Sequence, residues 1–295
     1  MPSCSDFESD GEKRGMGEVS FSAKDIKPFS VVRHAVFGVN NNPQVKFSSV
    51  EKVVEVSHWG NVGITENYRL VNTGPSLKGE FSRVTYGSRS QADARNAFKG
   101  IEFDLPYEIW GLYYQDEVGN ISTSKAYRDE SSRSVHVTLQ PRFALLGGWK
   151  SNWQIGYNFK TDGHLFNQGN HFELKNIKLE YALEKIIAEE FAIKLILPHG
   201  AENVRIKIGG HDYDMSLVET GTSEGYLDFS GRPTYLIAKF TGSPKDKFLD
   251  VSYDYAVNRT YEKPISLFLI VLAFLSFAIF IKRFKLAAFE DSKSE

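Results

Sequence analysis

The chain has 295 residues, a formal net charge of −2 at pH 7 and a single cysteine. Its charges are mixed along the sequence, and no basic stripe is interleaved with aromatic residues, so the composition argues against nucleic-acid binding. Because Cys4 is alone, the sequence holds no internal disulfide. A folded region of about 240 residues buries enough apolar surface to be stable without one.

A disordered tail is predicted for residues 1–20, which are rich in Ser, Gly, Asp, Glu and Lys and offer little to bury. The region 21–263 that follows is predicted to be mainly β. Runs such as VHVTL (135–139), VRIKI (204–208) and VSYDYAV (251–257) alternate apolar and polar side chains, which is typical of strands with one wet face. Further strand candidates are KVVEV (52–56), AIKLIL (192–197) and TYLIAKF (234–240).

Turn-forming clusters separate these strands, and no βαβ alternation is visible, so an antiparallel β-sandwich-like architecture is predicted. The segment 178–190 (KLEYALEKIIAEE) is the exception, because its Ala, Leu, Glu and Lys content favours a short helix. The glycine pair Gly147–Gly148 either divides two subdomains near 147–150 or lies in a loop within one. The turn clusters are NNNP (40–43), NTGP (72–75), DEVGN (116–120), LPHGAEN (197–203) and SGRP (230–233).

A transmembrane helix is predicted for residues 264–281, which hold no charged side chain. Its apolar run of about 17 residues spans ~25 Å, close to the ~27 Å core of a thin bilayer. A buried core helix is the alternative, but the segment has no polar face to show to water. The basic residues Lys282, Arg283 and Lys285 follow at once, so the positive-inside rule places the tail 282–295 in the cytosol and the large region on the other side.

One feature of this helix predicts a partner in the membrane. Ala273, Ser276 and Phe277, with Ala278 beside them, form a face of mostly small side chains, which allows close helix packing.

The first residues conflict with a lumenal large region. The sequence MPSCSDFESDGEKRGMGEVSF (1–21) has no apolar signal segment, which a lumenal domain requires. Either the natural sequence continues upstream into a further domain with a signal, or the helix is a tail anchor inserted after synthesis. We expect the former, with a fragment or truncated gene model as the cause, and a real short paralogue is the alternative.

A search for chemistry finds no catalytic, cofactor or metal motif. His211 and Asp212 sit in a Gly-flanked turn, and the acidic pair Asp116–Glu117 belongs to a turn without calcium-loop spacing. Two N-x-S/T sequons are present. Asn120 lies in a predicted hairpin turn, where a glycan acceptor is accessible, and Asn258 lies just before the membrane helix.

A series of short motifs runs along the chain ahead of the membrane helix. They are KDIKPFS (24–30), SHWGN (57–61), ENY (66–68), LKGEFSR (77–83), YYQDEVGNISTS (113–124), PRFALLGGWK (141–150), GYN (156–158), ILPHGAENVRI (196–206) and FSGRP (229–233). These motifs and the membrane helix occur in the order found in the ribophorin I family, which the chain resembles from about Lys24 to Ile281. Met1–Ala23 has no recognisable counterpart.

The resemblance implies a non-catalytic subunit of the oligosaccharyltransferase complex of the endoplasmic reticulum (ER), which N-glycosylates nascent proteins. The chain then corresponds to a second lumenal domain plus a type I membrane helix. Its partners are the catalytic and other subunits, nascent polypeptides and the ER membrane, and its role is structural and substrate-presenting. The family's signal peptide, first lumenal domain and long cytosolic extension are absent from this sequence. The alternative is a stand-alone type I β-sandwich receptor or adhesion module, and an enzyme comes third.

Overall fold

The computed structural model describes residues 11–14, 18–21, 43–74, 76, 80–82, 84, 97–225, 231–242, 244 and 247–291. Within the tail predicted to be disordered, β1 (Gly11–Arg14) and β2 (Glu18–Phe21) pair as an antiparallel ribbon. The rest of the tail and most of the NNNP turn lie outside the described residues, so the tail boundary at residue 20 stays a prediction.

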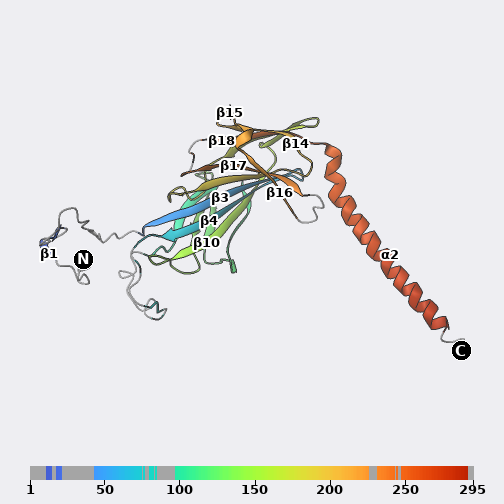
Figure 1. Cartoon of the computed structure of the whole chain (residues 1–295), viewed down its shortest axis with the longest axis horizontal. Helices are drawn as coiled ribbons and strands as arrows, with labels where there is room; N and C mark the ends of the chain where they lie inside the picture. Colours follow the sequence, from blue (N-terminus) through green and yellow to red (C-terminus); the bar gives the residue numbers. More distant parts are fainter. Residues whose placement is uncertain are drawn as a thin grey trace, which may run out of the picture.

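The largest element is an eight-stranded sheet, seen across the middle of Figure 1. The strands β3 and β13 run parallel, and the other neighbouring pairs are antiparallel. In spatial order the sheet consists of β16 (Glu219–Ser223), β17 (Arg232–Phe240), β13 (Phe191–Ile196), β3 (Val45–Ser57), β4 (Asn61–Asn72), β10 (Lys150–Lys160), β6 (Trp110–Asp116) and β7 (Gly119–Asn120).

Two smaller antiparallel sheets complete the β-rich region, and side chains from all three sheets join one hydrophobic core. Figure 1 shows the five-stranded sheet beside the large one, near the start of the long helix. Its order is β11 (Leu165–Gln168), β12 (His171–Lys178), β18 (Phe248–Asp254), β14 (Glu202–Ile208) and β15 (His211–Asp212). The three-stranded sheet consists of β5 (Ile101–Pro106), β9 (Ser134–Leu139) and β8 (Lys125–Asp129). A short 3-10 helix, η2 (Met215–Leu217), precedes β16.

The core follows from the alternating pattern of β3 and β4. Val54 and Val56 of β3 pair with Ile64 and Val62 of β4, and all four are buried. Burying one such side chain stabilises a fold by about 1.5–3 kcal/mol. A register slip by one residue would turn the whole set toward water, so the pattern fixes which face meets the core.

An aromatic cluster fills the centre of this core. The rings of Phe47, Tyr68, Trp153 and Tyr181 lie with centroids 4.8 to 6.4 Å apart. Tilted and edge-on pairs at these distances add about 0.5–1.5 kcal/mol each beyond the burial of their area. Tyr181 comes from the loop after β12, so the cluster ties that loop to the large sheet.

The mainly β prediction is confirmed, and the strand candidates fall in β3, β9, β13, β14, β17 and β18. Two boundaries differ. AIKLIL (192–197) runs one residue past β13, which ends at Ile196. VSYDYAV does not continue as a strand to Val257, because β18 ends at Asp254 and the backbone N–H of Tyr255 donates to the carbonyl of Asn170 instead. The 3-10 helix η3 (Val257–Tyr261) follows.

The helix predicted for residues 178–190 is wrong. The chain there ends β12 and continues through turns. Tyr181, Leu183 and Ala188 are buried, and the Tyr181 hydroxyl donates to the carbonyl of Ile186 and accepts the N–H of Ala188. Tertiary burial of these side chains has overridden a helical composition, which is a weak preference.

The region around Gly147–Gly148 leads into β10, which pairs with β4 on one side and β6 on the other. A subdomain division near 147–150 stays a prediction.

Candidate functional site

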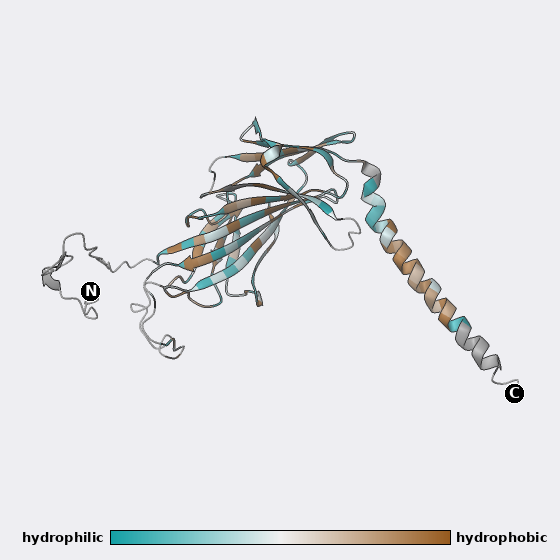
Figure 2. Ribbon diagram, viewed as in Figure 1, coloured by the Kyte–Doolittle hydropathy of each residue, from teal (hydrophilic) through white to brown (hydrophobic). Residues whose placement is uncertain are grey.

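The long helix α2 (Glu262–Asp291) carries the predicted membrane span. Within the described part of the chain it is the one helix long and apolar enough to cross a membrane. Figure 2 shows its apolar middle, and large apolar side chains from Ile265 to Ile281 are exposed around it. The helix begins two residues before the predicted start and ends ten residues after the predicted end. Pro264 lies in its first turn, where a missing N–H costs no helical bond.

The two serines of the span give their hydroxyls to their own helix. Ser266 Oγ donates to the carbonyl of Glu262 at 2.6 Å, and Ser276 Oγ donates to that of Leu272 at 2.8 Å. Polar groups in hydrocarbon need such partners, so neither hydroxyl opposes insertion.

The predicted packing face lies on one side of α2. Ala273, Ser276 and Phe277 are spaced by three and four residues, which places them next to each other on a helix. All three are exposed. Contact of this face with a partner helix stays a prediction.

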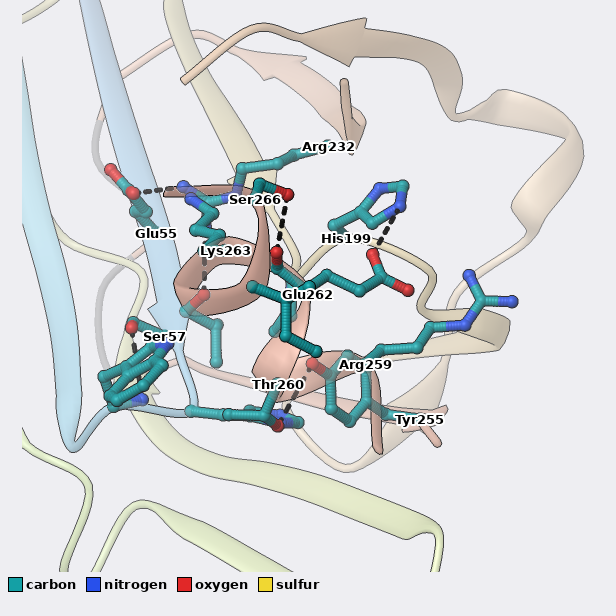
Figure 3. A pocket seen from close by; sticks show the side chains of 15 residues that line it. Glu55, Ser57, His199, Arg232, Tyr255, Arg259, Thr260, Glu262, Lys263 and Ser266 are labelled. Carbon is teal, nitrogen blue, oxygen red and sulfur yellow. Dashed lines mark hydrogen bonds and ion pairs between the residues drawn. The ribbon is translucent and has the colours of Figure 1, made fainter. Parts of the chain in front are cut away.

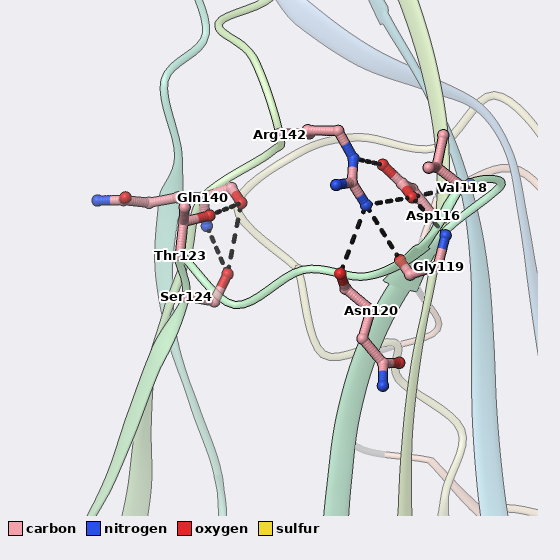
Figure 4. Close-up of polar contacts among 8 residues, drawn as sticks. All are labelled: Asp116, Val118, Gly119, Asn120, Thr123, Ser124, Gln140 and Arg142. Carbon is pink, nitrogen blue, oxygen red and sulfur yellow. Dashed lines mark hydrogen bonds and ion pairs between the residues drawn. The ribbon is translucent and has the colours of Figure 1, made fainter.

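The first sequon lies at the edge of the large sheet, in a tight hairpin between β6 and β7 (Figure 4). The Asp116 carboxylate accepts the N–H groups of Val118 and Gly119 at 3.0 Å each, and the Arg142 guanidinium closes the other side at 2.8 Å. These contacts, with the Arg142 hydrogen bond the strongest, lower the pKa of Asp116 to about 2.

The acceptor side chain of this hairpin is accessible. Asn120 and Ser122 are both exposed, and Ile121 between them is buried. The Asn120 carbonyl accepts from Arg142 at 3.4 Å, while its side-chain amide points away from that contact (Figure 4). The backbone is therefore held, and the amide faces outward.

The second sequon has a different setting. Asn258 lies in η3, and its backbone continues into α2 four residues later. The two sequons belong to separate elements, the edge of the large sheet and the connection to the membrane helix.

A cavity of about 440 Å³, here called the juxtamembrane cavity, lies between the β3–β4 turn and the first turns of α2 (Figure 3). Its walls come from the turn residues 57–59, from the loop after β13, and from η3 and α2. The helix is tied to the β-rich region here, because His199 Nε2 lies 3.3 Å from a carboxylate oxygen of Glu262.

A buried arginine fixes one wall of the juxtamembrane cavity. The Arg232 guanidinium donates to the Glu55 carboxylate, to the carbonyl of Val56 at 3.0 Å and to that of Leu197 at 3.3 Å. Only 9% of the residue is exposed. Arg232 therefore joins β17, the end of β3 and the loop after β13, and its planar fork suits this multiple role.

Aromatic side chains pack around His58 and hold the β3–β4 turn. The His58 ring stacks on Phe172 with centroids 4.3 Å apart and meets Tyr255 edge-on at 4.1 Å. His58 Nε2 lies 2.8 Å from the Tyr253 hydroxyl. Burial disfavours the charged imidazole and lowers the pKa of His58 to about 4.

Among the described residues, one cluster of ionisable side chains that resembles an active site is buried in the core. Glu66, fully buried, accepts from Tyr68, from Tyr157 at 3.3 Å and from the N–H of Ala182 at 2.8 Å, and it faces Lys52 Nζ at 3.0 Å. Burial and the Glu66 charge raise the pKa of both tyrosines well above the usual value. A substrate has no access to a carboxylate with no exposed surface, so this cluster is a structural network.

A second cluster lies on the surface, where Ser132, His136 and Asp104 form a row of neighbouring side chains. Asp104 contacts His136 Nδ1, and His136 Nε2 lies 3.5 Å from Ser132 Oγ. The Ser132 hydroxyl donates to Asp129 at 2.9 Å, so its proton is not directed at the imidazole. The turn is exposed and excludes no water, and nucleophilic catalysis needs a base aligned on the hydroxyl.

Metal chemistry finds no support among the described residues. No group of three or more His, Cys, Asp or Glu side chains there is arranged to hold an ion. His211 and Asp212 form the short exposed strand β15 after the Gly209–Gly210 turn, as expected of a solvated hairpin.

Comparisons with known proteins cover most of the chain. The family model for ribophorin I matches residues 5–282. The prediction that Met1–Ala23 has no counterpart is therefore wrong from residue 5 onward. The chain is 32% identical to "Dolichyl-diphosphooligosaccharide--protein glycosyltransferase subunit 1" of Caenorhabditis elegans, over 88% of this chain and 44% of that protein.

Plant proteins give similar matches. Subunit 1A of the same enzyme from Arabidopsis thaliana is 32% identical over 78% of this chain and 37% of its own length. Subunit 1B from Oryza sativa subsp. japonica is 34% identical over 78% and 48%. The chain thus spans less than half the length of the curated relatives it matches.

Likeness to solved structures is weaker. An M1 zinc metallopeptidase from Deinococcus radiodurans aligns with a TM-score of 0.39 and 10% identity, over 71% of this chain and 42% of that one. A TM-score this low carries no argument about activity. The family model matches nearly the whole sequence, and the chain belongs to the ribophorin I family.

Proposed function

We propose that this chain works as a membrane-anchored, non-catalytic subunit of the dolichyl-diphosphooligosaccharide–protein glycosyltransferase in the ER membrane. The observation that carries the proposal is the family match over residues 5–282, together with relatives that are named as subunit 1 of this enzyme. The name of these relatives includes a lipid-linked oligosaccharide and a protein acceptor. In this proposal both are substrates of the assembled complex.

The orientation we propose is type I, with the β-rich region 21–263 in the lumen. The basic residues after the span support it, because positive charge is retained on the cytosolic side. The outward-facing Asn120 amide also fits a lumenal surface, since glycan acceptors lie on accessible turns. The tail 282–295 then lies in the cytosol.

A non-catalytic role is supported by the two clusters that come nearest to an active site. Glu66 is sealed in the core, and Ser132 directs its proton at Asp129. In the complex, other subunits then supply the transfer chemistry. The β-rich surface contributes rigidity and presents nascent polypeptides, and the face of Ala273, Ser276 and Phe277 packs on a neighbouring membrane helix.

A receptor or adhesion module on the same anchor is the competing function, and it predicts a helix that any apolar segment can replace. A depletion experiment separates the two. Cells that lose the protein should underglycosylate a secreted reporter with several sequons, and re-expression should restore occupancy. A version whose α2 is exchanged for an unrelated apolar helix should fail to restore it. Normal reporter occupancy after complete depletion would contradict the proposal.

A further inference from the structure

One tryptophan is exposed beside the membrane helix. Trp59 lies at the tip of the β3–β4 turn with 64% of its surface exposed, an uncommon setting for so large a ring. The same turn lines the juxtamembrane cavity together with Ile265 and Ser266 of α2.

These neighbours fix the level of Trp59 relative to a bilayer. Ile265 is the first residue of the uncharged apolar run, so it marks where α2 enters hydrocarbon. Trp59 and Ile265 border one cavity, so a bilayer that α2 enters at Ile265 has its headgroup layer next to the indole. Tryptophan is enriched at this level, since its ring is apolar and its N–H needs a polar partner.

The turn is built to hold the indole in place. The Trp59 backbone N–H donates to Ser57 Oγ at 3.3 Å, and the preceding His58 is clamped by its aromatic neighbours. Gly60 closes the turn with a φ of +95°, which a residue with a side chain rarely adopts. The ring is therefore presented on a rigid support.

The side chains that line the cavity include three cations, Arg232, Arg259 and Lys263, and two carboxylates, Glu55 and Glu262. Arg232 pairs with Glu55, and His199 Nε2 lies 3.3 Å from Glu262. The Arg259 guanidinium lies against Gly200 and forms an ion pair with the exposed Glu202 at 3.7 Å.

Lys263 lines the same cavity four residues after Arg259. Arg259 belongs to the 3-10 helix η3 and Lys263 to α2, so their shared place is given by the cavity and not by helical spacing. Basic residues at the membrane surface attract lipid phosphates.

We propose that the juxtamembrane cavity binds the phosphate headgroup of a membrane phospholipid, with Arg259 and Lys263 on the phosphate and the Trp59 indole in the headgroup layer beside it. The proposal depends on α2 spanning a bilayer and not on assembly with a glycosyltransferase. The β-rich region then rests on the membrane through a second contact besides its helix, which limits its tilt.

The test of the indole uses the full chain in phosphatidylcholine nanodiscs whose lipids carry bromine near the headgroup end of the acyl chains. All measurements are made in a Trp110→Phe background. Trp110 is exposed and lines a second cavity together with Gly60, next to Trp59 in sequence, so bromine near Trp59 would also quench it. Bromine should quench the fluorescence strongly, and Trp59→Phe should remove most of that quenching.

Trp149 is the matched control. It precedes β10, whose opposite end pairs with Asn61 beside the turn, so it lies roughly 35 Å away along the strand. Trp149→Phe should leave the quenching intact. Equal quenching with and without Trp59 would overturn the proposal.

The test of the phosphate site counts phospholipids retained by the purified full chain in detergent, by native mass spectrometry. Arg259→Gln with Lys263→Gln should lose one bound phospholipid. Lys125→Gln with Arg133→Gln, two exposed cations on β8 and on the turn between β8 and β9, should lose none. Unchanged retention in the first pair would overturn the lipid site, as would a photo-crosslinker at position 59 that captures polypeptide and no lipid in native membranes.

Discussion

Lys52 and Glu66 face each other directly across β3 and β4, with Nζ 3.0 Å from Oε1, and both side chains are almost completely shielded from water. Removing two charges from water costs several kcal/mol per ion, which their attraction offsets only when the remaining hydrogen-bonding capacity is also satisfied. Tyr68, Tyr157 and the Ala182 N–H meet that need for Glu66, and the carbonyl of Glu180 does so for Lys52.

Loss of one member of this pair should destabilise the fold strongly. Lys52→Met keeps the volume but leaves the Glu66 carboxylate buried without its cation, which should lower the free energy of unfolding by about 3–5 kcal/mol. Urea denaturation of the full chain in nanodiscs, followed by tryptophan fluorescence, measures the loss.

The double variant provides the control. Lys52→Met with Glu66→Gln leaves no buried charge, and the Gln carbonyl still accepts hydrogen bonds. Its loss should be smaller than the sum of the two single losses by about 1–3 kcal/mol. Additive losses would show that the two side chains do not act as a pair.

His58 should give the fold an acid-sensitive component. Its pKa is about 4 in the folded chain and 6.5 in the unfolded chain, so the unfolded state binds more protons between these values. The stabilisation is complete above pH 6.5 and falls as the pH drops toward 4. We expect a loss of roughly 1–2 kcal/mol, less than full linkage because the ring is partly exposed.

A matched pair of variants isolates this titration. His58→Phe keeps the aromatic stack and removes the titrating group, so its urea midpoint should change less between pH 7 and pH 5 than that of the parent. His211→Gln, on the exposed strand β15, should behave as the parent does. A parent-like pH response of His58→Phe would assign the acid sensitivity elsewhere.

The strands were predictable because the alternation of apolar and polar residues indicates which side chains face the core. The sequence also carries a signal for the buried pair. Lys52 and Glu66 occupy inward positions between Val50 and Val54 and between Ile64 and Tyr68, where a charged side chain requires a buried partner. The partner itself was not predictable, because pairing across β3 and β4 depends on register.

The failed helix at 178–190 has a comparable cause. Its composition favours a helix, but its buried residues fall at 179, 181, 183, 186 and 188. Apart from one step of three they are spaced by two, which does not follow the period of a helix. The juxtamembrane cavity was beyond prediction for another reason. It joins residues 55–59 to residues 259–266, and only the tertiary fold brings segments so distant in sequence together.

Asn120 should carry a glycan if the β-rich region is lumenal, and Asn258 should carry little or none. Asn258 lies six residues before Pro264, at most about 20 Å along an extended chain and roughly 12 Å in a 3-10 conformation. A catalytic pocket held above the bilayer reaches it poorly. Expression with a signal peptide in ER-containing cells, followed by glycosidase treatment, reports the occupancy.

The variants Asn120→Gln and Asn258→Gln distinguish the sites. The mobility shift should disappear in the first and persist in the second. The reverse result would show that the reach argument is wrong, and no shift in any lumenal variant would show that a partner covers the hairpin.

The anchor should fail when a charge enters its centre. Phe274→Arg places a cation near the middle of the apolar run at a cost of roughly 2.5–3.5 kcal/mol on insertion scales. Carbonate extraction of membranes should release this variant, while Phe274→Leu should stay integrated. Full retention of Phe274→Arg would indicate that other contacts hold the chain in the membrane.

A variant on the predicted packing face distinguishes membrane anchoring from assembly with partner subunits. Ser276→Phe keeps the helix apolar but adds bulk between Ala273 and Phe277, where close approach of a second helix needs small side chains. The variant should remain integrated and lose most of its partner subunits on mild detergent extraction. Leu275→Phe, a bulky change on the opposite side of the helix, should keep them.

Affinity purification of the tagged chain from gently solubilised ER membranes tests the central claim most directly, when the eluate is assayed for glycan transfer from a lipid-linked donor to an acceptor peptide. Transfer activity should elute with the parent chain and with Phe274→Leu, and the isolated region Phe21–Tyr261 should show none, with or without divalent metal. The account would be contradicted if the parent chain eluted without transfer activity while the complexes were intact. It would also be contradicted if the isolated region transferred glycan and lost this activity when one carboxylate was replaced.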